Sequence, residues 1–373
     1  MAYKNGVGDE FITGVFDEDT KSAVIAFQTE SKLKADGTVG KKTYDALNAY
    51  QGLITEVKTE IVTMVRYVEK KSGNIFDVDL ETLSATPKTN TLIPRTYESF
   101  FVNDANGIVL RYAKDNETII ESFVGNIVPA QIETAPGKIE GSFLPENIPF
   151  LTISPDKKSI FYLVPNAGGI SGVVSNLDHT SKRPIFSSPF SEWIPDWTNK
   201  DTITLQTRAG AKADGYIYGL NVKNGDMFKI VGNIKGLAGT MSPDGSLLVY
   251  SKTMSNNKPA LFMRTISSGK DVDLGTQTLS EKCVWNPVRV KELYCAIPKS
   301  IPNGIYPDHW YQGRVSFDDE IWRLDGESGI YTQVVDPNES DAHLDIVNII
   351  VEKDGRSLIF IDKITGQLWM ERL

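Results

Sequence analysis

The chain has 373 residues, a net charge of −9 and a hydrophobic content of 40%, which suits one large domain together with a small one. The mild acidity argues against a nucleic-acid partner, because no basic cluster is present to neutralise phosphates. No stretch approaches the roughly eighteen apolar residues of a membrane-spanning helix, and Met1 to Gly6 contain no apolar segment of a secretory signal.

Two half-copies of one pattern occupy residues 14–47. In each half, a glycine-containing turn leads into a short helix whose apolar residues fall at i, i+1 and i+4. The first helix contains Phe27 and Gln28, and Asp17 and Gly40 stand at the two joints between turn and helix. Short polar residues or glycine at such joints satisfy the free N–H groups of a helix. The pattern therefore predicts a small helical module.

This order of turns and helices resembles the peptidoglycan-binding-like domain 1 family, whose modules attach envelope proteins to cell-wall polymer. The resemblance implies residues 1–50 as the module and residues 51–59 as a linker. The family's usual first helix has no counterpart in Met1 to Glu10, so either the chain begins inside its module or the module is degenerate. We expect the former, with the signal sequence also upstream. The resemblance implies a shallow polar binding groove, with these contributors here: Gln28, Asp36, Thr38, Thr43 and Tyr44.

Residues 60–373 have a different pattern, in which short alternating strands are separated by turns. Turn aspartates recur at intervals of 40 to 52 residues up to position 244, and a longer interval around Pro287 leads to the last one. Repeats of this length built from four strands are typical of a β-propeller. The turn residues that mark the repeats are Asp104, Asp156, Asp196, Asp244, Pro287 and Asp354.

The Ser-Pro-Asp-Gly turn and the aromatic strand after it resemble the WD40-like repeats of TolB-type propellers, which occur in bacterial envelope proteins. This resemblance extends over about five-sixths of the chain. Counting repeats gives seven blades, or six if the first is only partial. The predicted fold is therefore mainly β, a seven-bladed propeller with a small α-helical module at its N-terminus. We expect a strand from residues 56–68 to complete the last blade as its outer strand.

The two cysteines, Cys283 and Cys295, are centred on a turn at residues 286–291. A hairpin with this turn would place the two side chains directly opposite each other, within reach of a disulfide. The alternative is a pair of buried reduced thiols. We expect the disulfide, and with it an oxidising, extracytoplasmic location in the cell envelope.

The sequence contains none of the motifs of a hydrolase nucleophile or a phosphate-binding loop. His179, His309 and His343 lie in polar segments, and we expect them to be surface or structural residues. Residues 336–341 are rich in oxygen ligands but lack the glycine and glutamate of the known calcium loop, so we expect an ordinary turn. We therefore expect neither a metal nor a cofactor.

Two long loops rich in aromatic residues, 186–197 and 299–313, are typical of recognition sites. The alternative is that their rings pack between blades or close one end of the propeller. As partner-binding residues we predict Phe190, Trp193, Trp197, Tyr306, His309, Trp310 and Tyr311.

These features favour a non-enzymatic protein of the cell envelope. Its module would bind peptidoglycan, and its propeller would recognise a protein, peptide or glycan. The first alternative is a propeller enzyme (a lyase, glycosidase or peptidase-like protein), and the second is a structural subunit of a surface layer or filament. Enzyme candidates are Asp308, His309, Tyr311 and Arg314, although their spacing does not select them.

Overall fold

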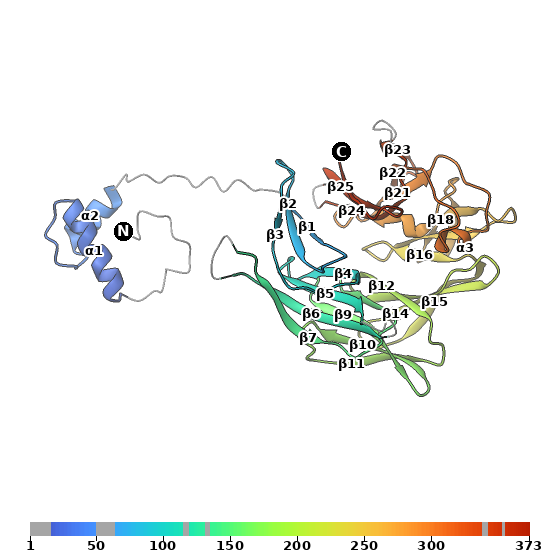
Figure 1. Ribbon diagram of the computed structural model, residues 1–373, viewed down its shortest axis with the longest axis horizontal. Helices are drawn as coiled ribbons and strands as arrows, with labels where there is room; N and C mark the ends of the chain where they lie inside the picture. The colour runs from blue at the N-terminus through green and yellow to red at the C-terminus, as the bar shows by residue number, and fades with distance from the viewer. Residues whose placement is uncertain (1–15, 50–63, 115–118, 131–134, 338–341, 353–354) are drawn as a thin grey trace. The chain divides into compact units, whose positions relative to one another are not determined.

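The computed structural model describes residues 16–49, 64–114, 119–130, 135–337, 342–352 and 355–373. The predicted linker at residues 51–59 lies outside these ranges, as do Gly14 and Val15 of the first turn. The chain divides into two compact units, the first with the two N-terminal helices and the second with most of the strands (Figure 1). Each unit is described by itself.

The helical module consists of α1 (Glu18–Glu30) and α2 (Lys41–Ala49). Asp17 is the N-cap of α1, and its Oδ1 accepts a hydrogen bond of 2.8 Å from the backbone N–H of Thr20. Gly40 directly precedes α2, and its carbonyl accepts from the N–H of Tyr44 at 2.9 Å. The predicted joints between turn and helix are thus confirmed.

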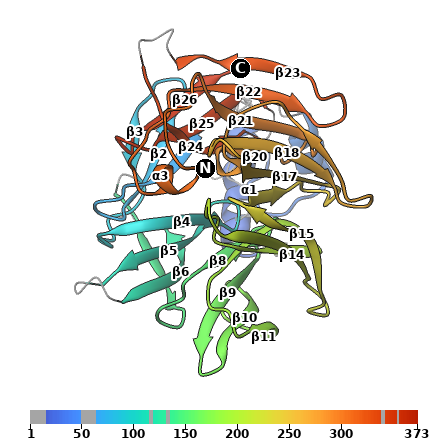
Figure 2. The ribbon, with the colours of Figure 1, turned by 90° about the vertical axis from the view of Figure 1, so that its right-hand side faces the viewer.

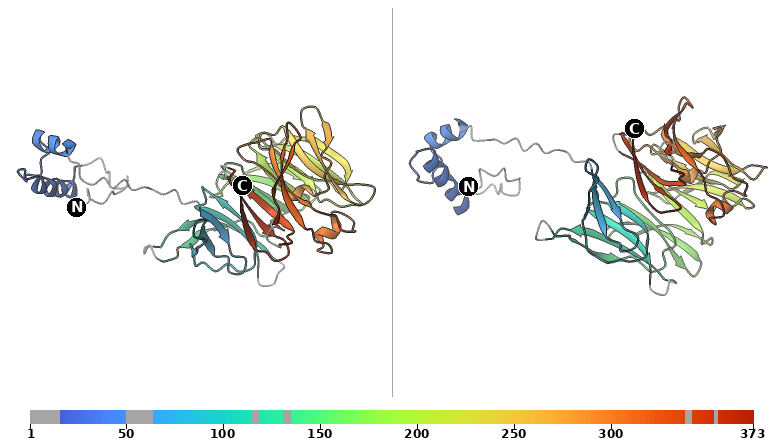
Figure 3. Two further views of the ribbon diagram at one scale, coloured as in Figure 1. Left: turned by 90° about the horizontal axis from the view of Figure 1, so that it is seen from above. Right: turned by 45° about the horizontal axis from the view of Figure 1, so that its top comes forward.

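Twenty-six strands of the described residues form seven sheets, the blades of a seven-bladed propeller. The sheets follow one another around a ring in chain order (Figure 2). Blades 2 to 6 have four strands, and blades 1 and 7 have three. The predicted fold class and the count of seven are confirmed. Figure 3 gives two further views with the same colours.

The strands of blades 1 to 3 are β1 (Met64–Val68), β2 (Ile75–Asp79) and β3 (Ala85–Pro87); β4 (Thr96–Val102), β5 (Gly107–Ala113), β6 (Ile120–Val128) and β7 (Lys138–Phe143); β8 (Leu151–Ile153), β9 (Ser159–Asn166), β10 (Gly169–Asn176) and β11 (Arg183–Ser188). Those of blades 4 and 5 are β12 (Trp193–Asn199), β13 (Thr202–Thr207), β14 (Asp214–Asn221) and β15 (Met227–Lys235); β16 (Ala238–Met241), β17 (Leu247–Thr253), β18 (Pro259–Thr265) and β19 (Lys270–Asp273). Those of blades 6 and 7 are β20 (Cys283–Trp285), β21 (Glu292–Pro298), β22 (Asp319–Asp325) and β23 (Tyr331–Val335); β24 (Ile346–Val351), β25 (Ser357–Asp362) and β26 (Leu368–Arg372).

One expectation about the ends of the propeller was wrong. Met64–Val68 forms β1 and is hydrogen-bonded to β2 in blade 1, so it is not the outer strand of blade 7. Residues 56–63 of the predicted strand lie outside the described residues. The local strand pattern predicted that residues 64–68 form a strand, but it does not encode which sheet a strand joins.

In blades 3 and 5 the repeated turns are built by the side chains that mark them in the sequence. Asp196, which we predicted as the turn residue of blade 4, lies instead within β12 and pairs with Thr204 of β13. Ser242 donates its hydroxyl to Asp244 Oδ1 at 2.6 Å and accepts from the N–H of Leu247 at 3.0 Å. Ser154 likewise donates to Asp156 Oδ1 at 2.6 Å. Short polar side chains that bond the nearby backbone favour such turns over continued strand. Each of these turns therefore connects the first strand of its blade to the second.

The core lies between consecutive blades. The second strand of each inner blade directs neighbouring residues to opposite faces, one toward the preceding blade and one toward the next. Ile160 of β9, for example, packs with blade 2, whereas Phe161 packs with blade 4. Six such contacts are centred on side chains with 0% exposure: Ile75 and Ile108, Val109 and Ile160, Phe161 and Leu205, Ile217 and Leu248, Val249 and Leu293, Ala296 and Leu358.

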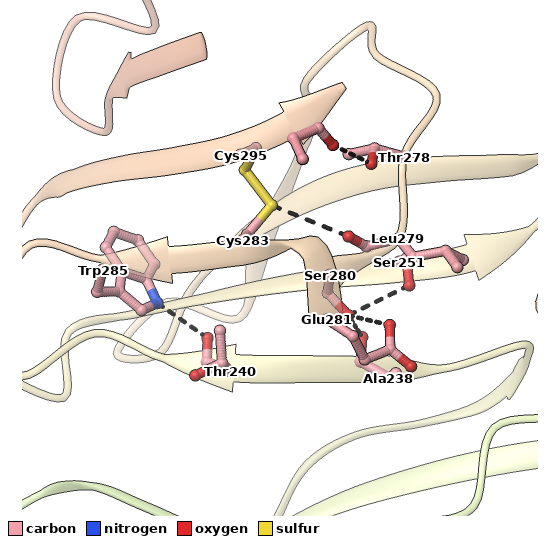
Figure 4. Close-up of a disulfide and its surroundings, with 11 residues drawn as sticks. Ala238, Thr240, Ser251, Thr278, Leu279, Ser280, Glu281, Cys283, Trp285 and Cys295 are labelled. Carbon is pink, nitrogen blue, oxygen red and sulfur yellow. Dashed lines mark hydrogen bonds between the residues drawn. A yellow bond between two sulfur atoms is a disulfide. The ribbon is translucent and has the colours of Figure 1, made fainter. Parts of the chain in front are cut away.

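The predicted disulfide is present in blade 6. Cys283 of β20 lies directly opposite Cys295 of β21, and the two sulfur atoms are 2.06 Å apart. Figure 4 shows the bond beside the short 3-10 helix η3 (Ser280–Lys282), where the Ser280 hydroxyl donates to the Ala238 carbonyl of blade 5 at 2.7 Å. The cross-link thus secures β20, the first strand of blade 6, at the point where it begins.

Candidate functional sites

In the helical module, Gln28 is the centre of a hydrogen-bond network. Its side-chain N–H groups donate to Asp36 Oδ1, the Thr38 carbonyl and Thr43 Oγ1 at 3.1, 2.9 and 3.1 Å. Its Oε1 accepts from the Gly37 N–H at 2.8 Å. Gln28 therefore connects α1 to the turn before α2 and to α2 itself.

Exposure divides the five predicted peptidoglycan-binding residues into two groups. Gln28 is 1% exposed and Thr43 is 5% exposed, so both face the interior of the module. Asp36 and Thr38 are exposed, and Tyr44 is 59% exposed. The observed contacts of Gln28 and Thr43 lie within the module. Direct contact with a ligand stays a prediction for all five residues, and exposure favours Asp36, Thr38 and Tyr44.

We expect Gln28→Leu to unfold the helical module without altering the propeller. The substitution keeps a similar volume but leaves the partners of the buried amide without hydrogen bonds. Each buried polar group left unpaired lowers the free energy of unfolding by about 1–3 kcal/mol. A module of this size has little stability to lose. Hydrogen exchange of peptides from residues 18–49 should become fast, whereas peptides of blades 3 to 6 should exchange as before. Tyr44→Ala, at an exposed position, is the control and should leave this exchange slow.

A long insertion at residues 299–318 interrupts blade 6 between β21 and β22 and contains the short helix α3 (Asp308–Tyr311). It is bonded to three other blades. Ala211 of blade 4 donates its N–H to Asp308 Oδ2 at 2.7 Å, and Thr253 of blade 5 donates its hydroxyl to the Tyr306 carbonyl at 2.6 Å. Lys363, which follows β25 of blade 7, donates to the Trp310 carbonyl at 2.6 Å. The insertion is therefore a fixed part of the propeller.

The predicted long loop at residues 186–197 is mostly strand, because Phe186 lies in β11 and both Trp193 and Trp197 lie in β12. This segment and the insertion bury most of the aromatic residues that we predicted to bind a partner. Trp193, Trp197, Tyr306 and Trp310 are at most 7% exposed and pack with their surroundings, as the alternative interpretation proposed. His309 is partly buried, and its Nδ1 accepts from the Ile305 N–H at 3.3 Å. Two predicted residues remain accessible for a partner, Phe190 at 69% and Tyr311 at 42% exposure.

Tyr311 belongs to a group of four accessible residues, each from a different connection between strands. Its hydroxyl donates to Glu281, and the positive charge of Arg208 acts on the same hydroxyl. Arg208 directly follows strand β13 of blade 4. The end of β13 pairs with the start of β12, and the loop that contains Phe190 leads into β12. We call these four residues (Phe190, Arg208, Glu281 and Tyr311) the cap surface. It offers one ring, one cation, one carboxylate and one phenol to a ligand.

The carboxylates near this surface have unusual acidities. Burial raises the pKa of Glu281, even though part of its side chain is exposed, and also raises the pKa of Asp196 in β12. Asp196 Oδ2 accepts a hydrogen bond from Thr240 of β16 at 2.8 Å. Burial and the charge of Glu281 raise the pKa of Tyr311. Glu281 and Asp196 both lie close to β16, the first strand of blade 5. Asp196 bonds to Thr240 of this strand, and Ser280, the residue before Glu281, bonds to Ala238 of the same strand.

Directly after Glu281, Lys282 lies in a buried charged cluster. Its Nζ is 2.8 Å from Asp319 Oδ2 and 2.6 Å from Asp345 Oδ1, and the side chains of all three residues are at most 1% exposed. Burial raises the pKa of Asp319 to about 6, against the opposing effect of Lys282. Trp310 donates its indole N–H to Asp345 Oδ2 at 2.9 Å, so the cluster also holds the insertion in place.

The enzyme candidates at 308, 309, 311 and 314 do not converge as a group. Asp308 and His309 accept hydrogen bonds from backbone N–H groups, and Tyr311 donates to Glu281 instead of to one of the other candidates. In the parts of the chain that the structure describes, no three His, Cys, Asp or Glu side chains group closely enough to hold a metal ion. None of the described helices is both long and apolar enough to cross a membrane.

Comparison with known proteins supports this division of the chain. Residues 3–47 match the family model described as a putative peptidoglycan binding domain. The match extends further toward the N-terminus than the motif from which we recognised the module. No curated protein matches the sequence.

Solved structures match the propeller. A GH74 enzyme from Niastella koreensis is 10% identical over 82% of this chain and 50% of its own, with a TM-score of 0.53. Oligogalacturonate lyase from Vibrio parahaemolyticus is 10% identical over 82% and 90% of the two chains, with a TM-score of 0.51. TolB from Acinetobacter baumannii is 12% identical over 83% and 76%, with a TM-score of 0.46. Identities this low indicate the fold alone. The chain therefore joins an N-terminal segment that matches the model of a putative peptidoglycan binding domain to a seven-bladed β-propeller.

Proposed function

We propose that this protein attaches to peptidoglycan through its helical module and uses the cap surface of its propeller to bind a protein, peptide or glycan. The observation that carries the first half is the family match over residues 3–47. The internal bonds of Gln28 support it further, since they give the module a defined fold. An extracytoplasmic location accords with both the module and the disulfide, because structural disulfides persist in oxidising compartments.

The contact with wall polymer would use the exposed predicted residues, which are Asp36, Thr38 and Tyr44. Hydrogen bonds from Thr38 N–H and Gln28 lower the pKa of Asp36, so it is an anionic acceptor at neutral pH. Tyr44 adds an exposed ring with a hydroxyl group, a combination that is common at recognition surfaces. Hydroxyl and amide groups of a glycan-peptide polymer are suitable partners for both.

Sedimentation with purified, insoluble peptidoglycan tests the anchoring function. The intact chain should sediment with the polymer, and Tyr44→Ala should bind about tenfold more weakly. Lys42→Ala, at an exposed neighbouring position in α2, is the matched control and should bind as the intact chain does. A chain without residues 1–50 should stay in solution. Equal sedimentation with and without these residues would eliminate anchoring by the module.

For the second half of the proposal, the cap surface supplies groups that suit recognition without a reaction. Phe190 provides apolar area, and Arg208 provides a charged donor that can pair with a carboxylate. Because the insertion is bonded to blades 4, 5 and 7, Tyr311 is held in place before a partner binds. Preorganised groups lose less conformational entropy on binding, which favours affinity.

A second candidate is an enzyme that uses the same surface, and one observation favours it. Glu281 and Asp196 both have raised pKa values, and perturbed carboxylates of this kind cluster at catalytic sites. Glu281 could then act as a general acid, with Tyr311 as its hydrogen-bond partner. The test is an assay for turnover of oligosaccharides or peptides. If the chain turns over such a ligand, and if Glu281→Gln abolishes turnover but still binds the ligand, the propeller is an enzyme and recognition is not its function.

A further inference from the structure

A pocket of about 530 Å³ lies between blades 5 and 6, at the base of the insertion. Leu274, just after β19, and Ile297 of β21 give it apolar walls, and Trp322 of β22 adds a large ring. A volume of this size is in the range of small-molecule sites, which combine apolar walls with a few polar groups. The pocket shares no residue with the cap surface.

The polar residues of the pocket are held by bonds to one another and to the adjoining Asp336. Lys299 Nζ is 2.9 Å from Asp336 Oδ1 and 3.5 Å from Glu320 Oε1. Trp322 donates its indole N–H to the other oxygen, Glu320 Oε2, at 3.0 Å. Lys299 and Asp318 are the two ends of the insertion, and the Lys299 N–H donates to the Asp318 carbonyl at 2.9 Å. These contacts fix the positions of the polar side chains.

Tyr331 of β23, in the wall of the pocket, has a hydroxyl without a partner. The hydroxyl is buried and makes no hydrogen bond with any residue that the structure describes. Burial and the negative charge of Asp273 raise the pKa of Tyr331, so the hydroxyl stays protonated and can donate. Burying an unsatisfied hydroxyl has a cost in stability, and a bound ligand that accepts a hydrogen bond would remove it.

The charges around the pocket select the class of ligand. Lys299 already faces two carboxylates, Glu320 and Asp336, so no positive charge remains for an anion. A neutral ring with an apolar face and several hydroxyl or amide groups fits the remaining features, which are the ring of Trp322, the hydrogen-bonding groups and the apolar walls. We propose that this pocket binds a neutral pyranose sugar, free or within a glycan.

Titration calorimetry on the full chain tests this proposal with cellobiose and N,N′-diacetylchitobiose as neutral probes and digalacturonate as the anionic one. We expect a neutral disaccharide to bind and digalacturonate not to bind. Trp322→Ala should weaken binding about tenfold or more, because the ring is lost. Tyr331→Phe should weaken it severalfold while the melting temperature stays equal or rises, since the variant removes only the unsatisfied hydroxyl.

Trp369→Ala is the matched control, because Trp369 occupies β26, the third strand of blade 7, as Trp322 occupies the third strand of blade 6. It should bind the disaccharide as the unmodified chain does. Three results would each overturn the proposal. They are no binding of either neutral probe, tighter binding of digalacturonate than of the neutral probes, and unchanged affinity in both Trp322→Ala and Tyr331→Phe. Normal binding of these soluble probes by Tyr44→Ala would show that the result is independent of wall anchoring, and weaker binding by Trp322→Ala would distinguish the pocket from the cap surface.

Discussion

Replacement of Lys282 by methionine should lower the free energy of unfolding by about 3–5 kcal/mol. Methionine has a similar length and no charge, so the substitution removes the cation between Asp319 and Asp345 with little loss of volume. Two buried carboxylates would then face each other without a counter-ion. Lys282 Nζ also lies 5.1 Å from the ring centroids of Trp310 and Phe317, and these cation–π contacts would be lost as well.

Thermal unfolding followed by tryptophan fluorescence measures this effect, and we expect the midpoint to fall by roughly 5–10 °C. Lys291→Met is the matched control. Lys291 also pairs with a carboxylate in blade 6, that of Glu327, but both side chains are exposed, and exposed ion pairs contribute little to stability. Adding Asp319→Asn to Lys282→Met should restore part of the stability, because one of the uncompensated charges is removed. Equal effects of Lys282→Met and Lys291→Met would contradict the structural importance of the buried cluster.

The propeller could be predicted from the sequence because its repeats depend on local chemistry. A serine two residues before an aspartate forms the same hydrogen bond at Ser154 and at Ser242, so the turn can be recognised wherever the residues recur. The disulfide could be predicted for a similar reason, since the register of a short hairpin follows from the position of its turn. In both cases the relevant partners are fewer than about fifteen residues apart.

The binding residues were harder to predict, because a polar or aromatic side chain in a sequence can face either way. Gln28 directly follows the buried Phe27 in α1 and also points inward, where its amide bonds to the loop before α2. Trp193 and Trp310 were expected at the surface and are buried. Accessibility in a loop depends on which other loops pack against it, and the spacing of residues does not report this.

The cap surface was missed for a related reason. Arg208 and Glu281 are 73 positions apart in the sequence and belong to loops of blades 4 and 6. Neither lies in a motif, and Tyr311 comes from a third loop. The radial order of the blades brings them together, so only the assembled propeller reveals the group. The same holds for Lys282, whose surroundings in Ser-Glu-Lys-Cys are typical of an exposed turn.

Replacing both cysteines by alanine should lower the free energy of unfolding by roughly 3 kcal/mol, as loop-closure entropy predicts for a cross-link between residues 12 positions apart. Alanine leaves no unpaired polar group at Cys295, which is 1% exposed. Comparison of denaturant midpoints under oxidising and reducing conditions separates the cross-link from the packing. In excess reductant the unmodified chain should approach the midpoint of the variant. A difference that persists after reduction would mean that packing of the sulfur atoms, and not the covalent bond, provides the stability.

The disulfide and the buried cluster should also depend on each other, because Lys282 immediately precedes Cys283. The cross-link fixes the start of β20, and this limits how far Lys282 can move away from Asp319 and Asp345. When two substituted sites share a backbone segment, their combined effect on the free energy of unfolding usually differs from the sum of the separate effects by about 0.5–3 kcal/mol. Combining the cysteine substitutions with Lys282→Met should therefore cost less than the sum of the separate losses, since the first change already lets the segment relax. Strict additivity would show that the two features stabilise blade 6 independently.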